Sequence, residues 1–158
     1  MAVQPIPVGY PRLMAYIVPR GAATAIEFYS KAFGARERMR LPGPNDTIGH
    51  AELQFGDSAV LMLADEPEMP VGYQSPETLG GSSFSFVLYV EDIDAVYRRA
   101  LEAGATSVEE PETKFYGDRE GRIRDPFGYV WSLMTHVEDV SPDEIQRRLQ
   151  AASEHAPG

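Results

Sequence analysis

The chain has 158 residues and no cysteine, and its 24 acidic and 14 basic side chains give a formal net charge of −10. This length suits one domain that buries roughly two thirds of its unfolded surface, and the lack of cysteine excludes thiolate nucleophiles, thiolate metal ligands and disulfides. The acidic excess disfavours a nucleic-acid partner; it suits a solvated surface or, where it lines a cleft, a cationic ligand.

The first half of the chain predicts the element order β-α-β-β-β. An apolar run over 13–18 predicts a strand. Ala25, Ile26 and Tyr29 recur at the helical spacing of three and four, and Gly34 stands where a left-handed residue ends a helix. Further strands are predicted at 36–41, 48–55 and 58–64, with a turn over 42–46.

The second half repeats this order after a linker. Residues 65–83 are rich in proline and glycine without periodicity, which predicts an irregular connection. The next predicted elements are a strand at 84–90, a helix from Ile93 closed at Gly104, and strands at 106–108, 121–124 and 129–135. A last helix is predicted at 141–152, because Ser141 can cap it, Pro142 fits its first position and Glu144 can complete a capping box.

The two halves are related by an offset of 70 positions. Gly34-Ala35 matches Gly104-Ala105, and the run from Gly56 matches the run from Pro126. A long repeat present twice predicts two copies of one module, about 11–65 and 83–137, that pack together within a single domain 1–158. A functional site is expected between them.

Short motifs add a family resemblance. They are Ala25-Ile26-Glu27-Phe28-Tyr29, Ala32-Phe33-Gly34-Ala35, His50-Ala51-Glu52-Leu53, Tyr89-Val90-Glu91-Asp92-Ile93, Phe115-Tyr116-Gly117-Asp118-Arg119 and Asp125-Pro126-Phe127-Gly128. With the paired modules, they resemble the PhnB-like branch of the vicinal oxygen chelate superfamily, which includes glyoxalase I, extradiol dioxygenases and bleomycin resistance proteins. The resemblance implies an α+β fold in which two β-α-β-β-β modules form a curved mixed sheet around a cup, and it implies a homodimer.

The same resemblance locates the metal ligands of metal-dependent members. It places them near Met14, at Met62, at Ser85 and at Ser132. None of these is a firm ligand for a divalent ion, which prefers His and carboxylate donors. The resemblance therefore implies a cup without the usual metal and without another cofactor.

The third predicted strand offers the strongest candidates for chemistry. Strand alternation puts Ala51, Leu53 and Phe55 on an apolar face and His50, Glu52 and Gln54 on the opposite face. The offset matches the polar three with Glu120, Arg122 and Arg124. His50 and Glu52 could form a proton-transfer pair or hold a divalent ion at a shifted site, or they could simply be solvated.

The remaining candidates each have a structural alternative. Met14, Tyr16 and Met62 would make an apolar floor for a bulky organic ligand, or fill the core. Arg119, after Tyr116, could grip a carboxylate or phosphate, or pair with Asp118 or Asp125 to hold a loop. Asp125-Pro126-Phe127-Gly128 predicts a tight turn, and His136 and His155 are weaker candidates.

Two functional hypotheses and one structural hypothesis follow. The first is a cytoplasmic homodimer that binds a small organic molecule without metal. The alternative is a glyoxalase-type lyase or isomerase that uses His50 and Glu52 with a divalent ion; a dimeric scaffold ranks lower. No membrane contact is expected, because no apolar run approaches the roughly 20 residues of a membrane span. Ligand contacts are expected from Met14, Tyr16, His50, Glu52, Met62, Tyr116, Arg119, Arg122 and Ser132.

Overall fold

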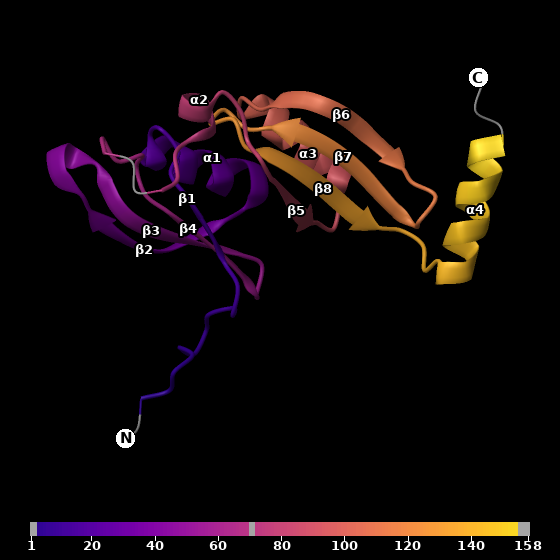
Figure 1. The fold of residues 1–158 in the computed structure, drawn as a ribbon, viewed down its shortest axis with the longest axis horizontal. Coiled ribbons are helices and arrows are strands. Elements are labelled where there is room, and N and C mark those ends of the chain that lie inside the picture. The colour runs from indigo at the N-terminus through magenta and orange to yellow at the C-terminus, as the bar shows by residue number, and fades with distance from the viewer. Residues whose placement is uncertain (1–2, 70–71, 155–158) are drawn as a thin grey trace.

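The computed structural model describes residues 3–69 and 72–154. Its first module contains β1 (Ala15–Ile17), α1 (Ala22–Phe33), β2 (Arg36–Pro42), the 3-10 turn η1 (Pro44–Asp46), β3 (Ile48–Phe55) and β4 (Ala59–Leu63). The short helix α2 (Pro76–Leu79) precedes the second module, which contains β5 (Ser85–Tyr89), α3 (Ile93–Glu102), β6 (Thr106–Thr113), β7 (Asp118–Arg124) and β8 (Val130–His136). Helix α4 (Pro142–Glu154) follows, and Figure 1 shows the two modules side by side.

Both modules form a four-stranded mixed sheet with the same topology, which confirms the predicted α+β fold. The strand orders are β1-β4-β3-β2 and β5-β8-β7-β6. In each sheet the first and last strands of the module pair in parallel and the other pairs are antiparallel. Tyr16 pairs with Met62, whereas Val87 pairs with Ser132, so the repeat is 71 positions in the opening strands.

Three predicted segments differ from the structure. Strand β6 extends to Thr113 instead of ending at 108, and β7 begins at Asp118 instead of 121. Pro111 is tolerated in β6 because β6 is an edge strand and Pro111 lies at an irregularity in its register. The linker contains α2, in which the Ser75 hydroxyl accepts a hydrogen bond from the Thr78 amide at 3.1 Å.

One core serves both modules. Helix α1 packs on α3, and each covers one face of its own sheet. The Trp131 ring of the second module lies 4.7 Å from the Phe33 ring and 5.3 Å from the Tyr29 ring of the first, so aromatic contacts join the modules as well. Leu53 and Ile123, from β3 and β7, point into the same core with no exposed surface. The opposite, polar faces of the two sheets therefore both point away from the shared core.

Asp125 stabilises this core through hydrogen bonds and is the first residue of the predicted turn. Its Oδ1 accepts hydrogen bonds from the amides of Phe127 and Tyr129, both at 2.9 Å. Its Oδ2 accepts from the Tyr29 hydroxyl at 2.8 Å and from the Trp131 indole at 2.9 Å. Burial raises the pKa of Asp125, and these four donors offset only part of that effect. Asp125 thus links α1 to the β7–β8 turn.

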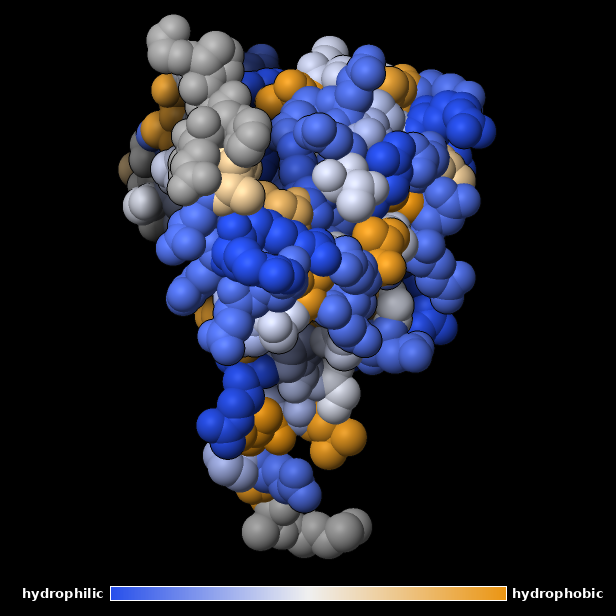
Figure 2. Space-filling model, turned by 90° about the vertical axis from the view of Figure 1, so that its right-hand side faces the viewer, coloured by the Kyte–Doolittle hydropathy of each residue, from blue (hydrophilic) through white to orange (hydrophobic). Residues whose placement is uncertain are grey.

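Helix α4 stands at one end of the molecule (Figure 1). The Ser141 hydroxyl accepts from the Glu144 amide at 3.3 Å, which confirms the predicted N-cap. Arg148 anchors the helix by donating to Glu138 at 2.7 Å and to the Phe115 carbonyl at 3.1 Å. Figure 2 shows that this end of the molecule is mainly hydrophilic with small, separate hydrophobic patches. His155 lies outside the described residues, and no helix among them is long and apolar enough to span a membrane.

Candidate ligand-binding site

The polar face of the first sheet carries four of the predicted ligand-binding residues, which we call the first wall: Tyr16, His50, Glu52 and Met62. Tyr16 pairs with Met62, and Met62 pairs with Glu52, so these three lie in one row across β1, β4 and β3. His50 precedes Glu52 by two residues on β3 and shares its face. The predicted alternation on this strand is confirmed.

A chain of hydrogen bonds crosses the first wall. The Tyr16 hydroxyl lies 3.2 Å from His50 Nδ1, and His50 Nε2 lies 3.4 Å from Glu52 Oε1. Glu52 is buried, and the Tyr10 hydroxyl lies 3.0 Å from each of its carboxylate oxygens. Arg38 stacks on the Tyr10 ring at 4.4 Å and approaches Glu52 to 3.8 Å. The structure thus brings His50 and Glu52 together as a hydrogen-bonded pair.

Two tyrosines keep their protons in this arrangement. The hydrogen bond to Glu52 raises the pKa of Tyr10, and burial adds to this effect. Burial raises the pKa of Tyr16, with a further contribution from Tyr73. Both hydroxyls are therefore neutral near pH 7 and act through hydrogen bonds rather than charge.

Two hollows adjoin the first wall. A groove of about 790 Å³ runs beneath the N-terminal segment and is lined by Met14, Glu52 and Met62, among others. Met14 precedes β1 rather than lying in it. A pocket of about 530 Å³ lies between β1, η1 and the start of the linker, and is lined by Tyr16, Tyr73 and the acidic residues Asp65, Glu66 and Glu68. The first wall thus offers a mostly apolar groove and an acidic pocket with an aromatic lining, joined by the hydrogen-bond chain.

The polar face of the second sheet, together with the turn before β7, carries the second wall: Glu120, Arg122 and Ser132 from the strands and Tyr116 from the turn. Arg122 donates to Glu120 at 2.7 Å, to Glu109 at 2.7 Å and to the Ser132 hydroxyl at 3.3 Å. The Tyr116 hydroxyl donates to buried Glu120, and burial with this bond raises the pKa of Tyr116 to about 12. Arg122 is half-exposed, so the second wall presents one cation held between two carboxylates.

Arg119 is not brought to either wall. It lies on the opposite face of β7 from Glu120 and Arg122, and its guanidinium donates twice to Asp94 of α3 at 2.8 Å. The pairing partner is therefore neither Asp118 nor Asp125. Bidentate pairing of this kind holds α3 against its sheet.

His136 also has structural contacts. Its Nδ1 lies 2.7 Å from Asp118 and its Nε2 lies 3.0 Å from Asp139, so it bridges β7 and the segment before α4. These bonds, that to Asp139 first, raise the pKa of His136. Tyr89 completes the cluster by donating to Asp118 at 2.7 Å.

The positions that the resemblance assigns to metal ligands do not fit a divalent ion. Met62 and Ser132 lie on the polar faces, where they offer a thioether and a hydroxyl. Met14 and Ser85 add the same weak donor types. Among residues 3–69 and 72–154, no three His, Asp or Glu side chains are placed to hold a metal ion. His50 and Glu52 supply two firm donors, fewer than the three or four of a zinc site.

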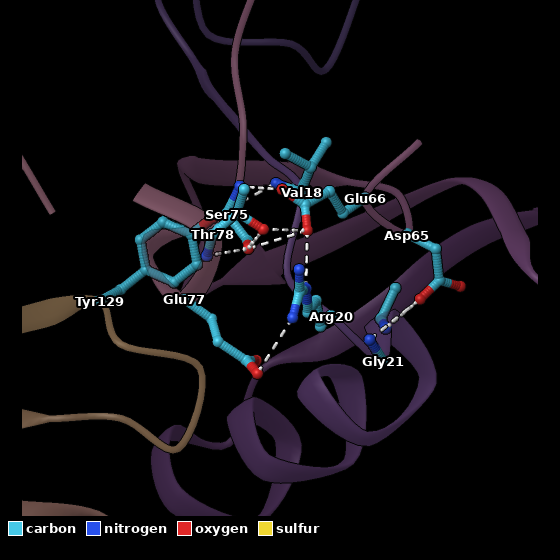
Figure 3. A network of polar contacts seen from close by, with 10 residues as sticks. Val18, Arg20, Gly21, Asp65, Glu66, Ser75, Glu77, Thr78 and Tyr129 are labelled. Carbon is cyan, nitrogen blue, oxygen red and sulfur yellow. Dashed lines mark hydrogen bonds and ion pairs between the residues drawn. The ribbon is translucent and has the colours of Figure 1, made fainter. Parts of the chain in front are cut away.

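A separate polar network secures the linker (Figure 3). Glu66 accepts from the Ser75 amide at 2.8 Å, from Thr78 at 2.7 Å and from Arg20 at 2.9 Å. Burial raises the pKa of Glu66, but these hydrogen bonds outweigh it and lower the pKa from 4.5 to about 2. Asp65 accepts from the Ala22 amide at the start of α1 and from the Ile48 amide, both at 2.7 Å. We interpret the network as structural, because its acceptors are filled by the chain itself.

The two walls do not meet within one chain. Each lies on the sheet face opposite the shared core, and no hydrogen bond or ion pair among the described residues joins a first-wall side chain to a second-wall side chain. A single copy therefore presents two separate half-sites, each on the side of its sheet opposite the shared core.

Comparisons with known proteins cover the same part of the chain. A family model for the Glyoxalase/Bleomycin resistance protein/Dioxygenase superfamily matches residues 13–133. The uncharacterized protein Rv0887c of Mycobacterium tuberculosis is 43% identical over 142 residues, which are 89% of this chain and 84% of that protein. The structure of the Arabidopsis thaliana protein At5g48480 superposes with a TM-score of 0.61 at 28% identity, covering 79% of this chain and 94% of that one. TioX from Micromonospora sp. ML1 superposes with the same TM-score, 0.61, at 21% identity, covering 83% of this chain and all of that one, a likeness of fold.

Proposed function

Because this chain belongs to the glyoxalase/bleomycin resistance protein/dioxygenase superfamily, we propose that it binds a small organic molecule without the metal used by metal-dependent members. The observation that carries this proposal is the composition of the first wall. Its deepest group is a buried carboxylate held by Tyr10, and its neighbours are the Met62 thioether and the Tyr16 ring. Polarizable apolar groups around a few fixed polar ones suit an organic ligand.

The cup of this proposal forms between two copies of the chain. A half-site that faces solvent buries little of a ligand, whereas small-molecule sites bury most of the ligand surface. A two-fold axis would place the first wall of each copy against the second wall of its partner, and the same contact would occur twice. The proposal therefore includes a homodimer with two equal cups, in the manner of the PhnB-like branch.

The distance between His50 and Glu52 favours an enzymatic alternative. His50 Nε2 and Glu52 Oε1 are 3.4 Å apart, within reach for proton transfer after small movements. A glyoxalase-type reaction on this pair would need an ion held by further donors, and the described residues of the same chain place no third His, Asp or Glu beside it. We therefore rank binding above lyase or isomerase activity.

Thermal shift measurements test the proposal. Ligand at 100 times its dissociation constant stabilises the folded state by about 2.7 kcal/mol, which raises the melting temperature by roughly 5–10 °C for a chain of this size. A panel of aromatic amines, alcohols and hydrocarbons should contain compounds that give such a shift. Ser132→Trp, which fills the second wall, should abolish it, and Arg98→Ala on the exposed side of α3 should retain it. A shift that survives Ser132→Trp would contradict the proposed cup.

Metal analysis provides the second test. The purified protein should carry no stoichiometric Zn²⁺ or Ni²⁺, because the positions that the resemblance assigns to metal ligands offer only thioether and hydroxyl donors. Met62→Glu combined with Ser132→Glu should increase affinity for these ions. Stoichiometric metal that resists chelator dialysis and disappears in His50→Ala would instead support the enzyme.

A further inference from the structure

Glu52 determines which groups donate and which accept along the hydrogen-bond chain of the first wall. The Tyr10 hydroxyl lies at the same distance, 3.0 Å, from both oxygens of Glu52, as expected for a donor centred on an ionised carboxylate. Arg38 adds a positive charge at 3.8 Å. An ionised carboxylate only accepts hydrogen bonds, so the proton between His50 and Glu52 belongs to His50 Nε2.

This assignment fixes the other end of the chain. A neutral imidazole with its proton on Nε2 has a lone pair on Nδ1. His50 Nδ1 lies 3.2 Å from the Tyr16 oxygen, so the Tyr16 hydroxyl donates a hydrogen bond to Nδ1. The Tyr16 oxygen then has only lone pairs left for the pocket that it lines.

Most other polar groups around that pocket also accept or are already committed, whereas the Asn45 amide and the Tyr73 hydroxyl can donate as well as accept. Asp65 and Glu66 are carboxylates, and Glu68 is an exposed third. The Thr47 hydroxyl donates to the Pro44 carbonyl at 2.5 Å, and the Ile48 amide donates to Asp65. Every described charged side chain that lines this pocket is a carboxylate. A ligand oxygen without a proton would meet the negative charge of these carboxylates and the lone pairs of Tyr16.

Two aromatic rings also shape the pocket. The Tyr16 and Tyr73 rings lie 6.0 Å apart at an interplanar angle of 61°, which makes an aromatic corner. A ligand ring can pack edge-to-face against both tyrosines in such a corner.

We propose that the pocket between β1, η1 and the linker takes the end of the ligand that carries a hydrogen-bond donor, an N–H or O–H on a flat ring, and that the Tyr16 oxygen accepts this hydrogen bond. This inference rests on the proposed binding function and deepens it by naming the ligand class. It assigns His50 and Glu52 as positioning residues that fix the polarity of Tyr16.

The polarity can be measured without any ligand. Nitrogen-15 NMR of the imidazole side chains distinguishes the two neutral tautomers, and His50→Gln identifies the resonances of His50 among the three histidines. The native protein should show His50 protonated on Nε2 in its neutral form. Glu52→Gln should reduce this preference, because the amide can also donate. A neutral His50 protonated on Nδ1 in the native protein would overturn the inference.

Phenol and anisole form a matched pair of probes, since they differ by a methyl group on the oxygen. Phenol should bind about fivefold more tightly than anisole, the effect of one hydrogen bond of ordinary strength. Tyr16→Phe should remove this preference. Tyr97→Phe, which deletes a hydroxyl bound to Ser107 at a distance from the pocket, should retain it.

The outcomes separate the two proposals. Equal binding of phenol and anisole to the native protein would refute the donor preference while leaving small-molecule binding intact. Binding of neither probe up to its solubility limit would overturn the assigned ligand class. Loss of all ligand-induced thermal shifts, with His50 still protonated on Nε2, would refute the proposed function but not the polarity of the first wall.

Discussion

Replacement of Asp125 should destabilise the protein more than the removal of any exposed ion pair does. Its carboxylate is buried and accepts four hydrogen bonds, two from backbone amides and two from Tyr29 and Trp131. Asp125→Ala leaves these four donors without their acceptor. Each buried donor without a partner costs at least about 1 kcal/mol, so we expect the free energy of unfolding to fall by about 4 kcal/mol. Asp125→Asn keeps one acceptor oxygen but turns an amide group toward the Trp131 indole, and should lose about 1–2 kcal/mol.

Urea denaturation followed by tryptophan fluorescence measures this effect, because the chain's single tryptophan, Trp131, contacts Asp125. Asp94→Ala is the matched control: it removes the carboxylate that pairs with Arg119, and because both side chains are partly exposed it should lose less than about 1 kcal/mol. If Asp125→Ala lost no more stability than Asp94→Ala, the assignment of Asp125 as the link between the modules would be wrong.

Three further predictions concern other fixed points of the fold. The lowered pKa of Glu66 means that its stabilising contribution is present above pH 4.5 and is lost as the pH falls toward 2, so Glu66→Gln should flatten the acid limb of a stability–pH curve. The raised pKa of His136 means that its contribution is present below pH 6.5 and is lost as the pH rises through the raised value; His136→Gln should remove that slope. Gly117→Ala should cost at least about 2 kcal/mol in urea denaturation, because Gly117 has φ +100° and a Cβ would lie 2.1 Å from the Glu138 carbonyl oxygen. An unchanged acid limb in Glu66→Gln or an unchanged slope in His136→Gln would contradict the corresponding contacts. A Gly117→Ala variant as stable as the native protein would contradict the close approach at Gly117.

The fold was predictable because its signals are local and occur twice. Strand β3 begins and ends at the predicted residues, and Gly34 and Gly104 both adopt the positive φ expected after a helix. The alternation of β3 also assigned Leu53 to the core face and Glu52 to the opposite face correctly, since Leu53 packs in the core and the Glu52 carboxylate meets Tyr10. Patterns of period 2 and 3.6 carry this information directly.

Contacts between distant segments were not predictable in the same way. Tyr10 reaches Glu52 from 42 positions away, and the N-terminal segment has no periodicity that would indicate its path. Arg119 had several acidic residues nearby in sequence, but its partner Asp94 is brought to it by the packing of α3 on β7. Such pairings depend on tertiary structure, which a single sequence does not encode in a readable pattern.

Cross-linking through introduced cysteines tests most directly whether two chains form the cup. The chain has no cysteine, so Met62→Cys and Ser132→Cys place single thiols in the first and second walls. Treated separately with a short bifunctional maleimide, each variant should remain largely a single chain; refolded together, they should give a covalent mixed dimer. Arg98→Cys, mixed with either, should give none. A link formed within one chain of the double variant, or no mixed dimer, would contradict the two-chain cup.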